Sequence, residues 1–283
     1  MTSITAVHHV NCGAMQPYGG ALFDGQTPGL APATLACHCL VLETSDGPVL
    51  VDTGTVAVNP SQAARAHSPL FRVVDRIRLN PSEAMVTQLR TLGYQPEQVR
   101  HIVMTHLDFD HAAGLVDMPG ATVHLSAAEA QAARTRSTPI AFNRYRPEQW
   151  GRNAPAAQQA GWRLYDQFEQ DWLGLPATEL DGLGPDVLLV PLPGHTRGHC
   201  GVVVRRPDGW LLHAGDAVFH HRELADRPST PSAARLYQWF MQTSQRQRRR
   251  SLAHLRALRA AHPDTLQIVC THDPSMLPAT TQG

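Results

Sequence analysis

Apolar residues recur along the chain in short runs rich in β-forming side chains and in longer stretches with helical spacing. Two β-rich runs within 33–54 flank Ser45-Asp46-Gly47, a turn sequence that predicts an antiparallel hairpin. A second hairpin is expected at 201–205 and 210–214, turning at Pro207-Asp208-Gly209. Single strands are predicted at 102–105, 122–125, 187–191 and 266–271.

Helices are predicted from apolar spacing and from end signals. Asn80-Pro81-Ser82-Glu83 supplies an N-cap and an N1 proline for a helix over 84–92, which Gly93 closes. A capping box, Ser126-x-x-Glu129, predicts the start of another helix, and residues 233–261 form a long helical region. Strands and helices follow each other twice without a low-complexity linker, so residues 1–283 are predicted to form one domain in two halves. The mixture of prolines and aromatics over 136–182 indicates an insertion or lid.

The composition is that of an ordinary globular protein, with 42% hydrophobic and 17% charged residues in 283. Because 24 basic residues balance 24 acidic ones, no overall charge favours a nucleic acid or an anionic membrane, and the basic run 246–250 is interpreted as a solvated helix face. The absence of a signal-like N-terminus and of any apolar run of 18 residues predicts a cytoplasmic protein. Five scattered cysteines suit reduced thiols, and Cys37 and Cys39 are expected on one face of a strand.

Potential metal ligands gather where predicted strands end. Four of them follow the strand run at 100–104 within six residues, and three more come just after other β-rich runs. Side chains at strand ends can converge from distant positions, so all are predicted to share one edge of the molecule. Each residue alone would pass for a turn or cap residue, but the joint pattern favours a metal site. The set is His106, Asp108, Asp110, His111, His195, Asp216 and His272.

The chain resembles the metallo-β-lactamase-fold hydrolases. The motifs that carry the resemblance occur in family order: VDTG at 51–54, THLDFDH at 105–111, PGHTRGH at 193–199, GD at 215–216 and TH at 271–272. The resemblance implies an αββα sandwich, an α/β (α+β) fold in which two mixed β-sheets are flanked by helices. It also implies two divalent metal ions, most often Zn²⁺, with Asp216 bridging them. By this resemblance, the first ion is held by His106, Asp108 and His195, and the second by Asp110, His111 and His272.

Asp108 departs from the family pattern, which most often has a histidine at this place. Its negative charge would make a core of two divalent ions, three aspartates and a hydroxide formally neutral, and a carboxylate increases the tolerance of the first site for iron or manganese. The alternative is that Asp108 only supports a ligand or caps a helix. Asp52 and His199 are predicted to brace ligands, as an aspartate does when it accepts the free ring N–H of a histidine.

Within the family, the motifs resemble the branch that opens acyl-homoserine lactones. A hydroxide between two such metal ions is expected to attack a carbonyl that one ion polarises, after which the second ion or Asp110 assists departure of the leaving group. Those lactonases carry a tyrosine three residues after the bridging aspartate, where this chain has Phe219; His220, His221 and Tyr145 are candidates to replace its donor. The segment 55–79 and the aromatics of 145–172 are predicted to form a pocket for an apolar acyl group. The predicted pocket residues are Phe71, Tyr145, Trp150, Phe219 and His220.

The main prediction is therefore a lactone or carboxylic ester hydrolase that acts on a small molecule, with no nucleic acid or membrane partner and with a homodimer left open. A thioester hydrolase of the glyoxalase II kind is the first alternative, although no cationic glutathione pocket is recognisable. A di-iron oxidoreductase is the second, although only 11 residues follow His272, too few for a flavin domain. A persulfide dioxygenase would leave half of the ligands idle, and a non-catalytic scaffold would not need the full set.

Overall fold

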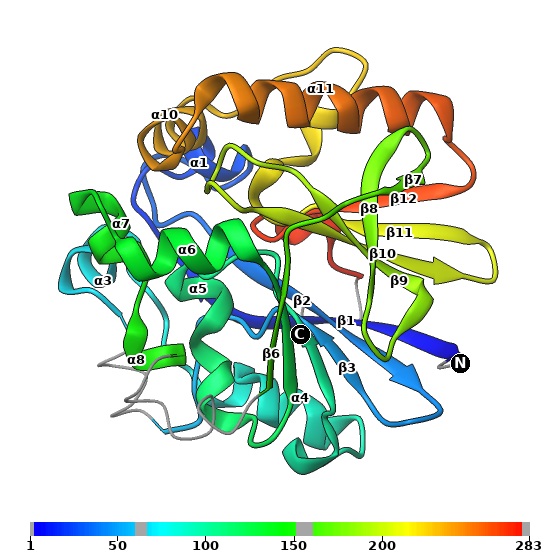
Figure 1. The fold of residues 1–283 in the computed structure, drawn as a ribbon. Helices are drawn as coiled ribbons and strands as arrows, with labels where there is room; N and C mark the ends of the chain where they lie inside the picture. The colour runs from blue at the N-terminus through cyan, green and yellow to red at the C-terminus, as the bar shows by residue number, and fades with distance from the viewer. Residues whose placement is uncertain (1–2, 60–66, 151–160, 279–283) are drawn as a thin grey trace.

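Two six-stranded β-sheets lie face to face in the computed structural model, which describes residues 3–59, 67–150 and 161–278 (Figure 1). The first sheet has the order β1-β2-β3-β4-β5-β6, and the second has the order β12-β11-β10-β9-β8-β7. The strands of the first are β1 (Ile4–Met15), β2 (Leu35–Thr44), β3 (Val49–Val51), β4 (His101–Val103), β5 (Thr122–Ser126) and β6 (Gly161–Tyr165). Those of the second are β7 (Gln170–Trp172), β8 (Leu175–Leu180), β9 (Gly184–Pro191), β10 (Cys200–Arg206), β11 (Gly209–His213) and β12 (Leu266–Val269).

Both sheets are mixed. In the first, β1, β2 and β3 pair antiparallel, whereas β3 to β6 run parallel. In the second, β7 to β11 pair antiparallel and β12 lies parallel to β11. Parallel neighbours end at the same side of a sheet, so segments that follow β3 and β4, or β11 and β12, emerge close together. This arrangement lets distant parts of the sequence contribute to one site.

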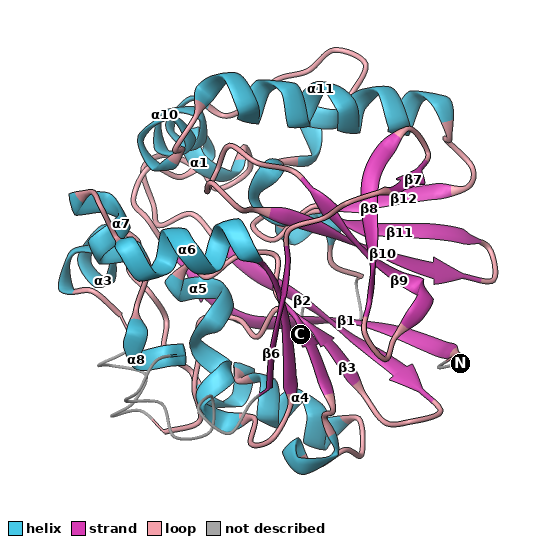
Figure 2. Ribbon diagram, in the orientation of Figure 1, coloured by secondary structure: helices cyan, strands magenta, loops and turns pink. Residues whose placement is uncertain are grey.

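Helices cover the outer faces of both sheets (Figure 2). On the side of the first sheet lie α3 (Pro69–Val74), α4 (Met85–Thr91), α5 (Phe109–Ala112), α6 (Ala127–Thr135), α7 (Pro139–Arg144) and α8 (Pro147–Trp150). On the other side, α11 (Gln245–Ala261) runs along the second sheet, beside α10 (Ser232–Met241) and α1 (Ala21–Asp24). Short 3₁₀ turns are η1 (Pro81–Glu83), η2 (Pro96–Gln98), η3 (Ala113–Asp117), η4 (Gly215–Ala217), η5 (His221–Leu224) and η6 (Pro274–Met276). The predicted sandwich of two mixed sheets with outer helices is confirmed.

The core is layered because successive residues of a strand point to opposite faces of the sheet. In β2, Leu40 and Leu42 belong to the cluster between the two sheets, whereas Cys39 and Val41 pack with the helices outside the first sheet. Leu255 of α11 belongs to the matching cluster outside the second sheet. A strand that is buried on both faces reads as a continuous apolar run, which is how β2 appears in the sequence.

Several sequence predictions need correction at the ends of elements. Asn80 caps the 3₁₀ turn η1, whereas α4 begins after Ala84. The helical region 233–261 is two helices, because Gln242 has an extended backbone and the Ser244 side chain caps α11. The capping box at 126–129 is wrong: Ser126 precedes α6, but its side chain makes no capping hydrogen bond.

The segment 136–182 supplies α7 and α8, then β6 to the first sheet and β7 and β8 to the second. Residues 151–160 of this predicted lid, and 60–66 of the predicted pocket wall, lie outside the described residues. All five cysteines are buried free thiols, and Cys37 and Cys39 lie on β2 as expected. Among the helices that the structure describes, none is both long and apolar enough to cross a membrane.

The layer between the sheets is expected to dominate stability. Leu40 is fully buried there, so Leu40→Ala should lower the free energy of unfolding by about 2–5 kcal/mol through lost burial and the cavity it leaves. Leu236, which is 64% exposed on α10, is the control. Leu236→Ala should change the free energy of unfolding by less than about 0.5 kcal/mol. Denaturant titration of both variants measures the difference, and equal effects would contradict this assignment of the core.

Candidate metal centre

The residues predicted as metal ligands meet at one edge of the sandwich, and we call them the donor cluster. His106, Asp108, Asp110 and His111 follow β4 and enter α5, so they come from the first sheet. The second sheet supplies the rest: His195 between β9 and β10, Asp216 in η4 after β11, and His272 after β12. Each of these residues is at most 5% exposed, and their ligand atoms form three groups in which all atoms lie within 4.8 Å of one another.

One half of the donor cluster contains His106, Asp108 and His195. Asp108 Oδ2 lies 3.0 Å from His195 Nε2 and 3.5 Å from His106 Nε2. Asp216 Oδ2 faces the same two nitrogens, at 3.3 Å from His195 and 3.9 Å from His106. Zinc–ligand bonds are about 2.0–2.2 Å, so donor atoms at these separations can share one ion.

The other half contains Asp110, His111 and His272. Asp110 Oδ2 lies 3.4 Å from His272 Nε2 and 3.9 Å from His111 Nε2. Asp216 reaches this half as well, because Oδ1 is 3.2 Å from His111 Nε2 and Oδ2 is 3.1 Å from His272 Nε2. The Asp216 carboxylate therefore lies between the two halves.

Buried atoms of the donor cluster lack hydrogen bonds. His106 Nε2 and Asp108 Oδ1 are buried without a hydrogen-bond partner in the described part of the chain. His111 Nε2 and Asp216 Oδ1 face each other at 3.2 Å, and neither makes a hydrogen bond within the described residues. A buried polar atom without a partner costs about 1–3 kcal/mol, so several together call for another species to satisfy them. Imidazole nitrogens and carboxylate oxygens suit zinc, iron and manganese, and the donor cluster therefore fits divalent metal ions.

Hydrogen bonds to the opposite ring nitrogens turn the histidines toward the donor cluster. His111 Nδ1 donates to Asp52 Oδ2 at 2.8 Å, and His272 Nδ1 donates to the carbonyl of Ala36 at 2.9 Å. His106 Nδ1 lies 2.9 Å from Thr105 Oγ1, a hydroxyl that itself donates to Asp52. A ring that donates through Nδ1 leaves the Nε2 lone pair for a metal ion.

Asp52 and His199 support the donor cluster through hydrogen bonds. Asp52 has a left-handed backbone (φ 58°) directly after β3, and it accepts hydrogen bonds from Thr105 N and Oγ1 besides that from His111. His199 Nδ1 donates to the carbonyl of Leu192, so its Nε2 accepts from the backbone N–H of Asp216 at 2.9 Å. The contact of Asp52 is the one expected of a residue that orients a ligand histidine, whereas His199 acts on the backbone of a ligand.

The carboxylates set the protonation of the histidines. Burial alone would lower the pKa of His111, but Asp216, Asp52 and Asp110 raise it well above its usual value. Asp216 likewise outweighs burial at His272 and raises its pKa. Burial lowers the pKa of His195 to about 4, since the Asp216 charge only partly opposes it and Arg144 adds to the shift. His195 is therefore neutral, whereas His111 carries a proton that a metal ion must displace.

Sequence reasoning missed Glu129, which holds the loops of the donor cluster together. Its buried carboxylate accepts from Leu107 N at 3.1 Å, Thr196 Oγ1 at 2.6 Å and Gly198 N at 3.1 Å. The loops that carry His106 and His195 are thereby tied to α6. The available signal was helical spacing, because Glu129 and the buried Ala133 are four residues apart and share a face.

Arg144 was also missed. It ends α7 inside the segment predicted as a lid, and its guanidinium is 1% exposed. The Nη2 atom lies 3.1 Å from Asp108 Oδ2 and 3.3 Å from His195 Nε2, so an arginine adjoins the first half of the donor cluster. Nothing in the spacing of this segment distinguishes Arg144 from Arg146, which pairs with Glu148.

The predicted pocket residues take different positions. The ring centroid of Phe219 lies 4.8 Å from that of His272 and 6.0 Å from that of His195, so it walls the donor cluster. Tyr145 is buried and forms an isolated backbone bridge with Asp108. Phe71 is buried and stacks on Phe109, one residue before Asp110. Trp150 is partly buried against the core outside the first sheet.

The candidate replacements for the missing tyrosine make other contacts. The rings of His220 and His221 stack on each other, while His220 Nε2 meets the carbonyl of Asp24. His221 Nδ1 donates to Asp273 Oδ2. These hydrogen bonds of both histidines are thus made with residues outside the donor cluster, whereas Tyr145 forms a backbone bridge with the donor residue Asp108.

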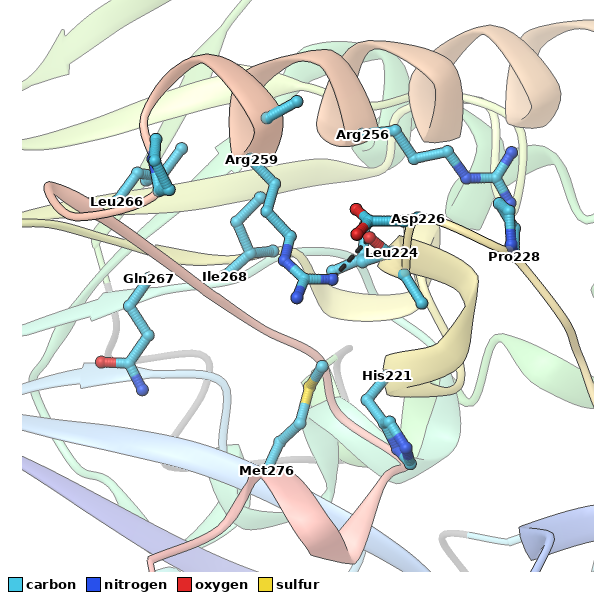
Figure 3. Close-up of a pocket in the computed structure, with 13 residues that line it drawn as sticks. His221, Leu224, Asp226, Pro228, Arg256, Arg259, Leu266, Gln267, Ile268 and Met276 are labelled. Carbon is cyan, nitrogen blue, oxygen red and sulfur yellow. Dashed lines mark hydrogen bonds between the residues drawn. The ribbon is translucent and has the colours of Figure 1, made fainter.

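Two cavities lie near these elements. One of about 470 Å³ is lined by Arg144, Tyr145, Ile140, Met241 and Thr243, so it reaches residues that adjoin the donor cluster. Another, of about 870 Å³, lies between α11, β12 and η5 (Figure 3). Arg259 points into it and donates to the carbonyl of Leu224, and its described lining holds no residue of the donor cluster.

Comparison with known proteins places this geometry in context. Residues 33–272 match the model of the metallo-beta-lactamase superfamily. A probable metallo-hydrolase of Mycobacterium tuberculosis is 38% identical over 271 residues, which cover 95% of this chain and 81% of that protein. An N-acyl homoserine lactonase of a Bacillus species is 30% identical over 187 residues, 65% of each chain. A solved N-acyl homoserine lactone hydrolase with its product N-hexanoyl-L-homoserine at the catalytic metal centre has a TM-score of 0.68 and 20% identity, covering 96% of this chain and 95% of that one.

Metal binding is expected to release protons. Because the pKa of His111 is raised in the metal-free protein, its proton competes with the metal, and the apparent metal affinity should rise with pH until His111 is neutral. Asp52→Asn removes one of the carboxylates that raise this pKa, so the midpoint should move to lower pH while the affinity at high pH falls about 10- to 100-fold. Calorimetric titration with Zn²⁺ in buffers of different ionisation enthalpy measures the protons released. Metal affinity independent of pH between 6 and 9 would contradict a protonated His111.

Proposed function

The chain belongs to the metallo-beta-lactamase superfamily, and we propose that it is a metal-dependent hydrolase that opens a lactone or a carboxylic ester. The observation that carries this proposal is the donor cluster itself, in which four buried ligand atoms have no hydrogen-bond partner in the described chain. A packed interior avoids such atoms unless a ligand satisfies them. The relatives support the bond type: one is named an N-acyl homoserine lactonase, and another was solved with an opened lactone as product.

His106, Asp108 and His195 would hold one divalent ion, and Asp110, His111 and His272 would hold a second, with Asp216 shared between them. When bound, such a pair of ions supplies a Lewis acid and lowers the pKa of water toward neutrality. Each half offers two histidines and one aspartate, a donor set that fits Zn²⁺, and the carboxylate of Asp108 makes iron or manganese acceptable in the first half.

Residues around the donor cluster would hold the donor atoms in place and limit the access of bulk water. Asp52 and His199 fix a ligand ring and the Asp216 backbone, which keeps the donor atoms in place without the reorganisation that water would require. Phe219 covers His195 and His272 with an apolar ring, which limits access of bulk water. Asp110 would assist departure of the alkoxide oxygen, because its carboxylate belongs to the donor cluster and lies beside His111 and His272.

The substrate is proposed to be a small molecule with an apolar acyl group. Phe219 presents an aromatic face at the donor cluster, and the neighbouring cavity of about 470 Å³ offers Ile140, Ala141 and Met241 beside hydroxyl groups. Pockets of this size and mixed lining suit ligands that combine an alkyl chain with an amide or ester. Phe219 lacks the phenol of the lactonase branch, so activation of the carbonyl would depend on the metal ions more than on a side-chain donor.

Removal of a shared or catalytic carboxylate should abolish turnover. Losing the partner of a metal ligand costs about 10- to 100-fold, so losing a ligand in Asp216→Asn or Asp110→Asn should exceed ~100-fold in kcat/KM. Asp166→Asn is the matched control, because Asp166 is exposed on the loop after β6. Hydrolysis is followed by pH-indicator assay with γ-lactones and aryl esters. Parental rates in either site variant would exclude the proposed mechanism.

A substrate panel tests the bond type. Purified protein loaded with Zn²⁺ should hydrolyse N-acyl lactones and aryl esters faster than thioesters, β-lactams or phosphodiesters, and kcat/KM should rise with acyl length because the proposed pocket is apolar. A preference for thioesters would transfer the assignment to the glyoxalase II kind of activity. Absence of hydrolysis together with a reducible di-iron spectrum would favour an oxidoreductase.

A further inference from the structure

Arg144 is a buried cation at the first half of the donor cluster. Its Nη2 atom contacts Asp108 Oδ2 at 3.1 Å and His195 Nε2 at 3.3 Å, and its Nη1 donates to the carbonyl of His195 at 3.1 Å. Its Nε is buried without a partner in the described chain. The guanidinium therefore spans one proposed ligand and both the ring and the backbone of another.

A buried guanidinium needs a nearby negative charge, because an isolated ion in a dry interior costs many kcal/mol. Asp108 provides it, being 2% exposed and in direct contact. Glu129 acts on Arg144 from further away, and its carboxylate is already engaged with the loops of Leu107 and Gly198. Asp108 and Arg144 are thus each other's nearest counter-ion.

We propose that Asp108 and Arg144 work as one unit that replaces the histidine usual at this place, with Arg144 as the positioning residue. Arg144 Nη2 contacts Oδ2 of Asp108, the oxygen that also faces the two histidines of this half, so it orients the carboxylate. Oδ1 of Asp108 is buried without a hydrogen-bond partner in the described chain. The pair cancels the negative charge that Asp108 alone would add. This inference rests on the proposed function, because it assigns a role at the same metal centre.

A count of formal charges shows why the unit is equivalent to histidine. Two divalent ions with Asp108, Asp110 and Asp216 carry a net charge of plus one. A histidine at 108 would leave plus two, and Arg144 restores plus two. Because ionic charges are the largest local terms in a metal site, an uncompensated aspartate would weaken the Lewis acidity on which hydrolysis depends. The pair keeps that charge, and the planar guanidinium contacts Asp108 Oδ2 through Nη2 and the carbonyl of His195 through Nη1, a fork that a lysine cannot supply.

A role in substrate binding fits Arg144 less well. Both terminal nitrogens already contact Asp108 or His195, and the side chain is 1% exposed although the residue lines the 470 Å³ cavity. Only Nε lacks a partner in the described chain and it is buried, whereas a substrate-binding arginine would present its terminal donors toward that cavity. The contacts instead face the ligand residues, so the effect of Arg144 should be seen in metal binding before it is seen in substrate affinity.

A double-mutant cycle tests the pair. The variants are Arg144→Gln, Asp108→His and the double variant Asp108→His/Arg144→Gln, with Arg146→Gln as the matched control on the adjoining turn. Affinity for Zn²⁺ and Co²⁺ is measured by competition with a chelator, and Co²⁺ absorption reports the ligand field at the first half. In each single variant, the affinity for the more weakly bound of the two metal ions should be about 10- to 100-fold lower than in the parent protein. The double variant should return to within about threefold of the parent, and Arg146→Gln should match the parent.

The outcomes separate this inference from the proposed function. A parent protein that binds no divalent metal would overturn both. A parent that binds metal and hydrolyses lactones, with unchanged metal affinity and Co²⁺ spectrum in Arg144→Gln, would overturn the pair alone. A double variant whose metal affinity is no higher than that of the weaker-binding single variant would also overturn the pair. Should the single variants fail to fold, restored folding and metal binding in the double variant would support the pair, and a double variant that stays unfolded would overturn it.

Discussion

The carboxylate of Asp216 lies among four histidines, two from each sheet, and the site depends on this contact between the halves. His106 and His111 arrive from the first sheet, and His195 and His272 arrive from the second. A buried carboxylate is costly unless cations or hydrogen bonds surround it. The two sheets must therefore dock with their strand ends aligned, or Asp216 and its histidines would each lie buried without a partner. Packing of the apolar layer between the sheets and assembly of the site are parts of the same event.

Buried hydrogen bonds around the donor cluster fix the loops that carry the ligands as well as the histidine rings. Asp52 joins the end of β3 to Thr105 and His111, and Glu129 joins α6 to the loops before His111 and after His195. The close approach of Gly198 to α6 belongs to this support, because a Cβ there would lie 2.0 Å from the backbone nitrogen of Glu129. Such contacts hold donor atoms at separations that a metal ion requires, so binding loses less conformational entropy.

The departures from the family pattern are linked by charge. Asp108 brings a carboxylate where histidine is usual, and Arg144 at the end of α7 brings the counter-charge. Phe219 brings an apolar ring where the lactonase branch has a phenol, and the centroid of this ring lies 4.8 Å from that of His272. Arg144 thus offsets the charge of Asp108, and Phe219 places an apolar ring beside the two histidines of the second sheet.

Local patterns in the sequence determined the hairpins and the ligand candidates, whereas the two-sheet sandwich was expected from the resemblance that the motifs carry. Strand runs with turn residues between them predicted both hairpins, and donors placed directly after strands, such as His106 and Asp216, predicted a shared edge. Glu129 shows the limit of such patterns: its spacing from Ser126 suited a capping box, but three loop donors at longer range offered its carboxylate better partners. Only the tertiary structure decided that Arg144, not Arg146, adjoins Asp108. The two arginines are separated by a single residue and are alike in sequence. Only the docking of α7 against the donor cluster buries the charge of one and leaves the other to pair with Glu148.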